Sequence, residues 1–414
     1  RKFDTRLVLF MALLYMLNFL DRSNIGNARV AGMEEDLQTD PPREGWYEWA
    51  LTAFYITYIL FEWMAILWNL VPAHIYVSLV VLSWGVIASL QAVAVSYPML
   101  IALRALLGIG EAAFTGVPFY LSFFYKRHEL AFRTALFVSA APLASTFAAS
   151  LAWLIVKLAR AGPIAPWRLL FLVEGFPSVL VALVAWRVVP DSPQTARYLT
   201  PRERKVARLR LRREKTHDRH FSPSSASSSP SLSSPKPVVA QRSLETREIL
   251  QILRDPLAWL TAAMLFLTNM AYASLPVFLP TILSEMGHSR LAAQALAAPP
   301  YLVAFASVLA TAAFSDRRRS RAYPVALHAL ASAAGYALLA LAEPLRLPPA
   351  LRYAAVYPAA AGFFSVVALV IAWSVNNQPS DTRRGAGFAL LQLVGQCGPL
   401  IGTRLYPDRD APFY

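Results

Sequence analysis

Residues 75–95 read IYVSLVVLSWGVIASLQAVAV, which are 21 consecutive residues without a charged side chain. A helix of about 20 residues crosses a hydrocarbon core of about 30 Å. Because lipid offers the backbone no hydrogen-bond partner, this segment is predicted to span a membrane as a helix. A transmembrane β-barrel would instead show segments of about 10 residues with alternating polarity, and the chain has no such pattern.

Similar apolar blocks recur along the 414 residues, of which 56% are hydrophobic and 15% charged. A soluble domain has about 25% charged residues. The blocks predict eleven spans, near residues 6–27, 46–68, 75–95, 98–121, 134–158, 167–189, 257–284, 291–314, 323–342, 352–375 and 384–405. We therefore predict an all-α membrane protein with two six-helix bundles, eleven spans being present and the twelfth missing. The bundles are residues 1–189 and 257–414, and a cytoplasmic linker at 190–256 joins them.

The net charge of +14 does not require a nucleic-acid partner. The positive-inside rule explains it better, because Lys and Arg gather in the segments that lie inside if the N-terminus is cytoplasmic. The chain has one cysteine, Cys397, which excludes an internal disulfide and a zinc site built from cysteines. Neither a cofactor nor a metal site is predicted.

The linker begins with a helix signal, since Thr200-Pro-Arg-Glu203 is a capping box with proline at the first helical position. Basic residues follow from Lys205 to Lys215, interleaved with Val206 and Leu209. One interpretation is an amphipathic helix on the anionic inner leaflet, and the other is a solvated basic helix. Residues 221–238, rich in Ser and Pro, are predicted to be disordered.

Polar residues interrupt the first span. Asn18 and Arg22 are four residues apart, so they share a helix face, and Asp21 lies beside them. Ionisable groups in a membrane are costly, which makes them functional candidates. This polar stripe is expected to face a wet central cavity. The alternative is a structural Asp-Arg clasp between helices.

The fourth span contains Arg104 and Glu111, which are two helical turns apart on one face. A buried arginine keeps its charge, whereas a buried carboxyl group can exchange a proton. The pair suits a fixed anion anchor beside a proton acceptor, or a salt-bridge network that only packs the bundle. Glu174 in the sixth span is a third buried carboxylate. It would titrate or, as we favour, pair with Arg168 or a neighbouring helix.

The second bundle has few charges inside its spans and offers hydrogen-bonding side chains instead. These polar residues would complete a substrate site or simply join helices. They are Asn269, Tyr272, Tyr301, Asn376, Asn377, Gln392 and Gln396.

Taken together, several motifs resemble the fungal allantoate-permease branch of the anion:cation symporter family, within the major facilitator superfamily. They are Asn18-Phe-Leu-Asp21-Arg22-Ser-Asn24-Ile-Gly-Asn27, Arg104…Gly108…Glu111, Trp167-Arg168…Glu174-Gly175, Ser315-Asp316-Arg317, Asn376-Asn377 and Gly398…Gly402…Ala411-Pro-Phe-Tyr414. Two features depart from the family pattern. The loop 69–74 has only His74 in place of a basic cluster, and Trp63-Met-Ala-Ile-Leu-Trp68 lacks the usual Pro and Asn.

The resemblance implies twelve spans, alternating access and proton-coupled uptake of small organic anions such as allantoate or nicotinate. It implies that Arg22 and Arg104 contact the anion and that Glu111 takes the proton. Further candidates are Asn18, Asn269, Tyr272 and Gln392 for substrate binding, and Asp21 and Glu174 for proton coupling. The expected partners are the organic anion, protons and membrane lipids.

We expect a monomeric multi-pass protein of the plasma membrane that is not an enzyme. Two alternatives to transport stay open at this point. One is a nutrient sensor on the same scaffold, which binds without carrying, and the other is an inactive transporter fragment.

Overall fold

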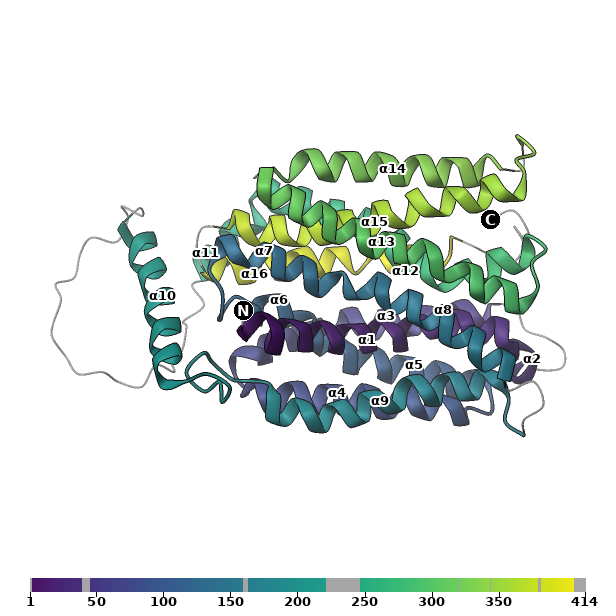
Figure 1. The fold of residues 1–414 in the computed structure, drawn as a ribbon, viewed down its shortest axis with the longest axis horizontal. Helices are drawn as coiled ribbons and strands as arrows, with labels where there is room; N and C mark the ends of the chain where they lie inside the picture. The colour runs from purple at the N-terminus through teal and green to yellow at the C-terminus, as the bar shows by residue number, and fades with distance from the viewer. Residues whose placement is uncertain are drawn as a thin grey trace.

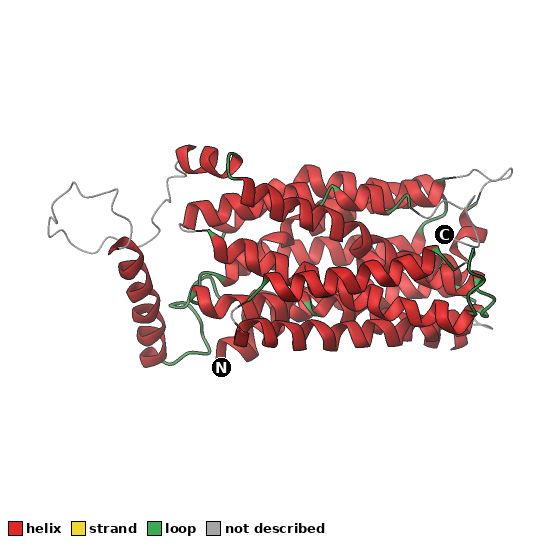
Figure 2. Ribbon diagram, turned by 90° about the horizontal axis from the view of Figure 1, so that it is seen from above, coloured by secondary structure: helices red, strands yellow, loops and turns green. Residues whose placement is uncertain are grey.

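The computed structural model describes residues 2–38, 45–158, 163–220, 246–318, 320–342, 344–378 and 381–405. Within these ranges every regular element is a helix, and most helices run along one common axis (Figures 1 and 2). This confirms the prediction of an all-α fold. The predicted disordered stretch 221–238 and the motif residues 411–414 lie outside the described residues.

Short π- and 3-10 segments (η) extend several of the α-helices. The elements are η1 (Asp4–Val8), α1 (Leu9–Ala28), η2 (Arg29–Met33), α2 (Glu34–Leu37), α3 (Trp46–Phe61), η3 (Glu62–Asn69), α4 (Ala73–Leu90), η4 (Gln91–Val93), α5 (Tyr97–Ala112), η5 (Ala113–Gly116), α6 (Val117–Leu121), α7 (Arg127–Val138), α8 (Ala140–Leu158), α9 (Pro166–Val188), α10 (Pro201–His220), α11 (Thr246–Leu253), α12 (Pro256–Glu285), α13 (Arg290–Arg318), α14 (Ala322–Ala340), α15 (Pro349–Asn377), α16 (Asp381–Gly395) and α17 (Gly398–Gly402).

Ten helical stretches of the described chain are long and apolar enough to cross a membrane, and each overlaps a predicted span. The predicted span 46–68 is not among these ten stretches. Its α-helix, α3, has 16 residues and continues as the 3-10 helix η3. The first span was predicted too short, since the helix runs from Asp4 to Leu37. It continues past residue 27 through the π-turn η2, where Gly32 adopts a φ of 99°.

The basic helix predicted in the linker is α10. Its capping box is formed, because the Thr200 amide donates to Glu203 Oε2 at 2.8 Å and the Glu203 amide donates to Thr200 Oγ1 at 3.3 Å. The Lys2 ammonium, 2.6 Å from Glu203, and the Thr200 amide lower the pKa of Glu203 to about 2. α10 lies beyond one end of the bundle and crosses the direction of the long helices (Figure 1). We call this end the linker end and the end that carries α2 the loop end.

Helix α1 lies in the middle of the bundle (Figure 1) and packs against α8, α9 and α12. Near the loop end the approach is close. A Cβ on Gly26 would lie 2.0 Å from the Val277 carbonyl oxygen of α12. The centre of α1 is therefore held between helices from the first and the second part of the chain, and the predicted polar stripe lies there.

Candidate substrate cavity

A cavity lies between helices of the first and second parts of the chain, around the centre of α1. Six of its polar side chains come from α1, α3 and α5, and three from α12 and α16. The lining polar residues within helices are Tyr15, Asn18, Arg22, Tyr55, Tyr58, Glu111, Asn269, Tyr272 and Gln392, together with Thr115 of η5 and with Gln396 just after α16. Hence one space contains a cation, a carboxylate and several neutral hydrogen-bonding groups.

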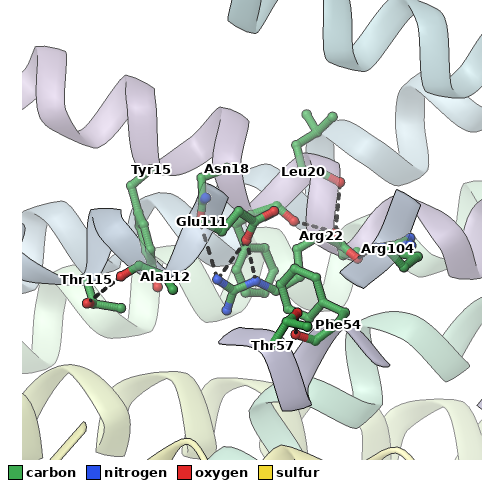
Figure 3. Close-up of polar contacts among 12 residues, drawn as sticks. Tyr15, Asn18, Leu20, Arg22, Phe54, Thr57, Arg104, Glu111, Ala112 and Thr115 are labelled. Carbon is green, nitrogen blue, oxygen red and sulfur yellow. Dashed lines mark hydrogen bonds and ion pairs between the residues drawn. The ribbon is translucent and has the colours of Figure 1, made fainter. Parts of the chain in front are cut away.

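The charged pair in this cavity is Arg22 and Glu111 (Figure 3). Arg22 Nε and Nη2 donate to the same oxygen of Glu111, at 3.0 and 2.8 Å. Arg22 Nη2 also lies 3.5 Å from Asn18 Oδ1, as their shared face predicts. The guanidinium carbon stands 5.3 Å from the ring centre of Phe54 and 4.8 Å from that of Tyr58. Removing one partner of a buried pair costs about 3–5 kcal/mol where no other opposite charge takes its place.

Arg104 does not line the cavity, although it was predicted to contact the anion. Its side chain is buried, and Nη1 donates to the backbone carbonyl of Arg22 at 3.1 Å. Its Nε and Nη2 have no hydrogen-bond partner among the described residues. Glu111 therefore pairs with Arg22 on α1 and not with Arg104 on its own helix. The reason is that seven residues separate Arg104 from Glu111 by about 10 Å along α5.

Asp21 and Glu174 lie on another side of α1 from the cavity. Asp21 Oδ2 accepts a hydrogen bond from Ser178 of α9 at 3.1 Å. Glu174 is buried one turn away on α9, and neither of its carboxylate oxygens has a partner in the described chain. Its expected pairing with Arg168 is absent, because Arg168 donates to the Ala92 carbonyl at 2.9 Å. The two carboxylates therefore face the contact between α1 and α9.

In the second part of the chain, Tyr272 reaches across the cavity to the first part. Its hydroxyl lies 2.7 Å from that of Tyr15, whose ring stacks on Phe137 with centroids 4.4 Å apart. Asn269 Nδ2 donates to the Gly395 carbonyl at 3.1 Å, which joins α12 to α16. Gln392 also lines the cavity. The structure thus brings together Asn18, Arg22, Asn269, Tyr272 and Gln392, while their roles stay predictions.

Sequence reasoning missed several residues at this site. Tyr15, Tyr55 and Tyr58 lie within the apolar blocks, where the sequence does not distinguish a tyrosine that lines a cavity from one that packs in the core. Glu62, at the start of η3, does not line the cavity, but it is buried and both of its oxygens lack partners within the described ranges. The rule that an ionisable residue within a span is a functional candidate would have found it. No cluster of His, Cys, Asp or Glu that could hold a metal ion occurs in the described part of the chain.

The family model described as the Major Facilitator Superfamily matches residues 11–403. The chain belongs to this superfamily. It is 32% identical over 420 residues to the MFS transporter prlL of a fungal species, covering 99% of this chain and 79% of prlL. It is 26% identical to the high-affinity nicotinic acid transporter of Saccharomyces cerevisiae, over 100% of this chain and 72% of that protein.

The fold agrees with the family. The structure of the proton:xylose symporter XylE bound to 6-bromo-6-deoxy-D-glucose superimposes with a TM-score of 0.72. The match covers 99% of this chain and 92% of XylE at 14% identity, so it shows a shared fold only. The chain is therefore a multi-pass membrane protein with the fold of a major facilitator transporter. Members of this superfamily are transporters and not enzymes.

Proposed function

We propose that this transporter carries a small organic anion, a carboxylate, together with a proton by alternating access. The observation that supports the proposal most is the Arg22–Glu111 pair in the wall of the cavity. A permanent cation paired with a carboxylate makes anion binding depend on protonation, since the guanidinium becomes available when the carboxylate is neutralised.

In this mechanism a proton first neutralises Glu111, which ends its ion pair with Arg22. The substrate carboxylate then takes the guanidinium, whose planar N–H donors suit a bidentate carboxylate contact. The far end of the substrate meets Asn269, Tyr272 and Gln392 across the cavity. A ligand that contacts both walls stabilises the conformation that closes around it. When the proton leaves, Glu111 competes again for Arg22 and the anion is released.

The bundles that rock about the cavity are, in this proposal, residues 1–189 and 257–414, with 190–256 as a cytoplasmic linker. Asp21 and Glu174 serve proton coupling behind α1, and Arg104 positions Arg22. We place the chain as a monomer in the plasma membrane with the linker end in the cytoplasm. The motif resemblance supports the allantoate-permease branch, and the similarity to a nicotinic acid transporter supports a carboxylate substrate.

The test is uptake of labelled carboxylic acids, nicotinate among them, by cells that express the chain. We expect the initial rate for a transported acid to rise about tenfold when external pH falls from 7.5 to 5.5. A protonophore should abolish accumulation, and a neutral analogue such as nicotinamide should not compete with nicotinate. Uptake that ignores the protonophore would contradict proton coupling, and equal competition by the neutral amide would contradict anion selectivity.

The same assay separates the alternatives. A nutrient sensor would bind a carboxylic acid in the purified state without mediating any uptake. An inactive fragment would do neither, although it would insert into membranes.

A further inference from the structure

Glu62 occupies an unusual position at the end of α3. It is the first residue of the 3-10 helix η3, directly after Phe61, whose φ and ψ of −102° and 5° leave the α-helical region. Its exposed fraction is 7%, and both carboxylate oxygens lack a hydrogen-bond partner among the residues described. A buried carboxylate without a partner is costly, so packing alone does not explain this residue.

Glu62 interacts electrostatically with groups in three parts of the fold. They are the Arg22 guanidinium of α1, the Tyr58 hydroxyl of α3, and the Cys397 thiol between α16 and α17. Arg22 is the one permanent charge among these neighbours. Cys397 belongs to the second part of the chain, so Glu62 stands where the two parts meet.

Helix α3 connects Glu62 to the ion pair in the cavity. Phe54 and Tyr58 are four residues apart and share one face of α3. The Arg22 guanidinium lies over both of their rings. Glu62, the unpartnered carboxylate, follows Tyr58 by about one turn towards the linker end, just beyond the last residue of α3.

We infer that Glu62 is a reserve counter-charge for Arg22, a positioning residue that holds the guanidinium when Glu111 is neutral and no substrate is bound. This inference rests on the proposed function only where it assigns a proton to Glu111. A buried guanidinium cannot lose its charge, so it needs another anion once Glu111 is neutral. The substrate supplies that anion in the loaded carrier, and Glu62 supplies it in the empty one.

A double-mutant cycle on thermal stability tests this without any substrate. Glu111→Gln removes the carboxylate that pairs with Arg22, and Glu62→Gln removes the proposed reserve carboxylate. Each single variant should melt within about 2 °C of the parent, because one carboxylate remains for Arg22. The double variant should melt about 5 °C below the sum of the single effects, since the guanidinium is then buried without an anion.

Two further variants keep the result decisive. Adding Arg22→Gln to the double variant should restore the lost stability, or restore expression if the double variant does not fold. Glu48→Gln is the control, because it removes the same charge from the first turn of α3, 14 residues before Glu62. Its effect on the melting temperature should simply add to that of Glu111→Gln.

Strictly additive effects of Glu62→Gln and Glu111→Gln, or no recovery on adding Arg22→Gln, would overturn the inference. A failed uptake assay would count against the proposed function and leave this cycle unaffected.

Discussion

At the scale of single residues, Arg22 is held by several contacts at once. It pairs with Glu111, its guanidinium lies over two aromatic rings, and its backbone carbonyl accepts a hydrogen bond from Arg104. Aromatic faces attract a guanidinium, by about 2 kcal/mol when the group is desolvated. These contacts hold a permanent charge at the cavity wall and leave Glu111 as the partner that can change its charge.

Glu111→Gln separates binding from coupling. The amide keeps the shape of the protonated carboxyl group, so the variant should still exchange labelled for unlabelled substrate across the membrane. Accumulation driven by a pH gradient should fall at least about tenfold, because no proton is taken up at this position. Counterflow and gradient-driven uptake in proteoliposomes measure the two activities. A variant that still concentrates substrate under a proton gradient would show that Glu111 does not couple.

At the scale of elements, α1 joins the two parts of the chain. Neighbouring residues on a helix point about 100° apart, so Arg22 faces α5 and the cavity while Asp21 faces α9. One turn nearer the loop end, Gly26 lets the backbone of α12 come into direct contact. The same helix therefore carries the ion pair and the close contact between the parts.

Gly26→Ala tests that close contact. The added methyl group would lie 2.0 Å from the Val277 carbonyl oxygen, so α1 and α12 have to separate at the loop end. We expect a melting temperature lowered by about 5 °C or more and a loop end that opens more readily. The opening is measured by maleimide labelling of Asn27→Cys in a chain that also carries Cys397→Ser. The labelling rate should rise several-fold when Gly26→Ala is added.

Gly110→Ala is the matched control, since its methyl group would meet Ser83 Oγ of α4 at 3.1 Å, within the first part of the chain. It should change stability without changing the labelling of residue 27. Equal labelling rates in both variants would mean that the Gly26 contact does not close the loop end.

At the scale of the whole molecule, the two parts of the chain are in contact at the loop end. Gln294 Nε2 donates to the Asn27 carbonyl at 3.3 Å, Arg290 pairs with Glu35, and Tyr47 meets Phe278 edge to face. The cavity extends in the other direction, past Thr115 and Pro118 and the side chain of Phe388. These positions fit a carrier whose cavity opens towards the linker end.

A crosslink should stop this carrier in the closed-loop state. Asn27→Cys and Gln294→Cys, in the Cys397→Ser background, place two thiols across the contact. A short bifunctional thiosulfonate should reduce uptake to background, and a reductant should restore it, because alternating access needs this end to open. Chains with one of the two cysteines should keep their uptake under the same treatment. Undiminished uptake in a fully crosslinked chain would contradict opening at this position.

Sequence patterns were sufficient to predict the helices and most of the polar residues that line the cavity. The length and apolarity of each block decide that it forms a spanning helix, and ten of these predictions are confirmed. The shared face of Asn18 and Arg22 also followed from spacing alone. Such properties depend on residues within one helix, whose geometry is regular, so they can be derived without knowing any neighbour.

Only the tertiary structure decided which residues meet. Spacing placed Arg104 and Glu111 on one face, yet Glu111 pairs with Arg22 from another helix. Glu174 has no basic partner among the described residues. Tyr15 contacts Tyr272, although 257 positions separate the two residues in the chain. These pairings depend on how helices rotate and shift against one another, which close packing of many side chains sets. The sequence by itself therefore determined the spans and their polar faces, whereas the tertiary structure alone determined the ion pair that defines the cavity.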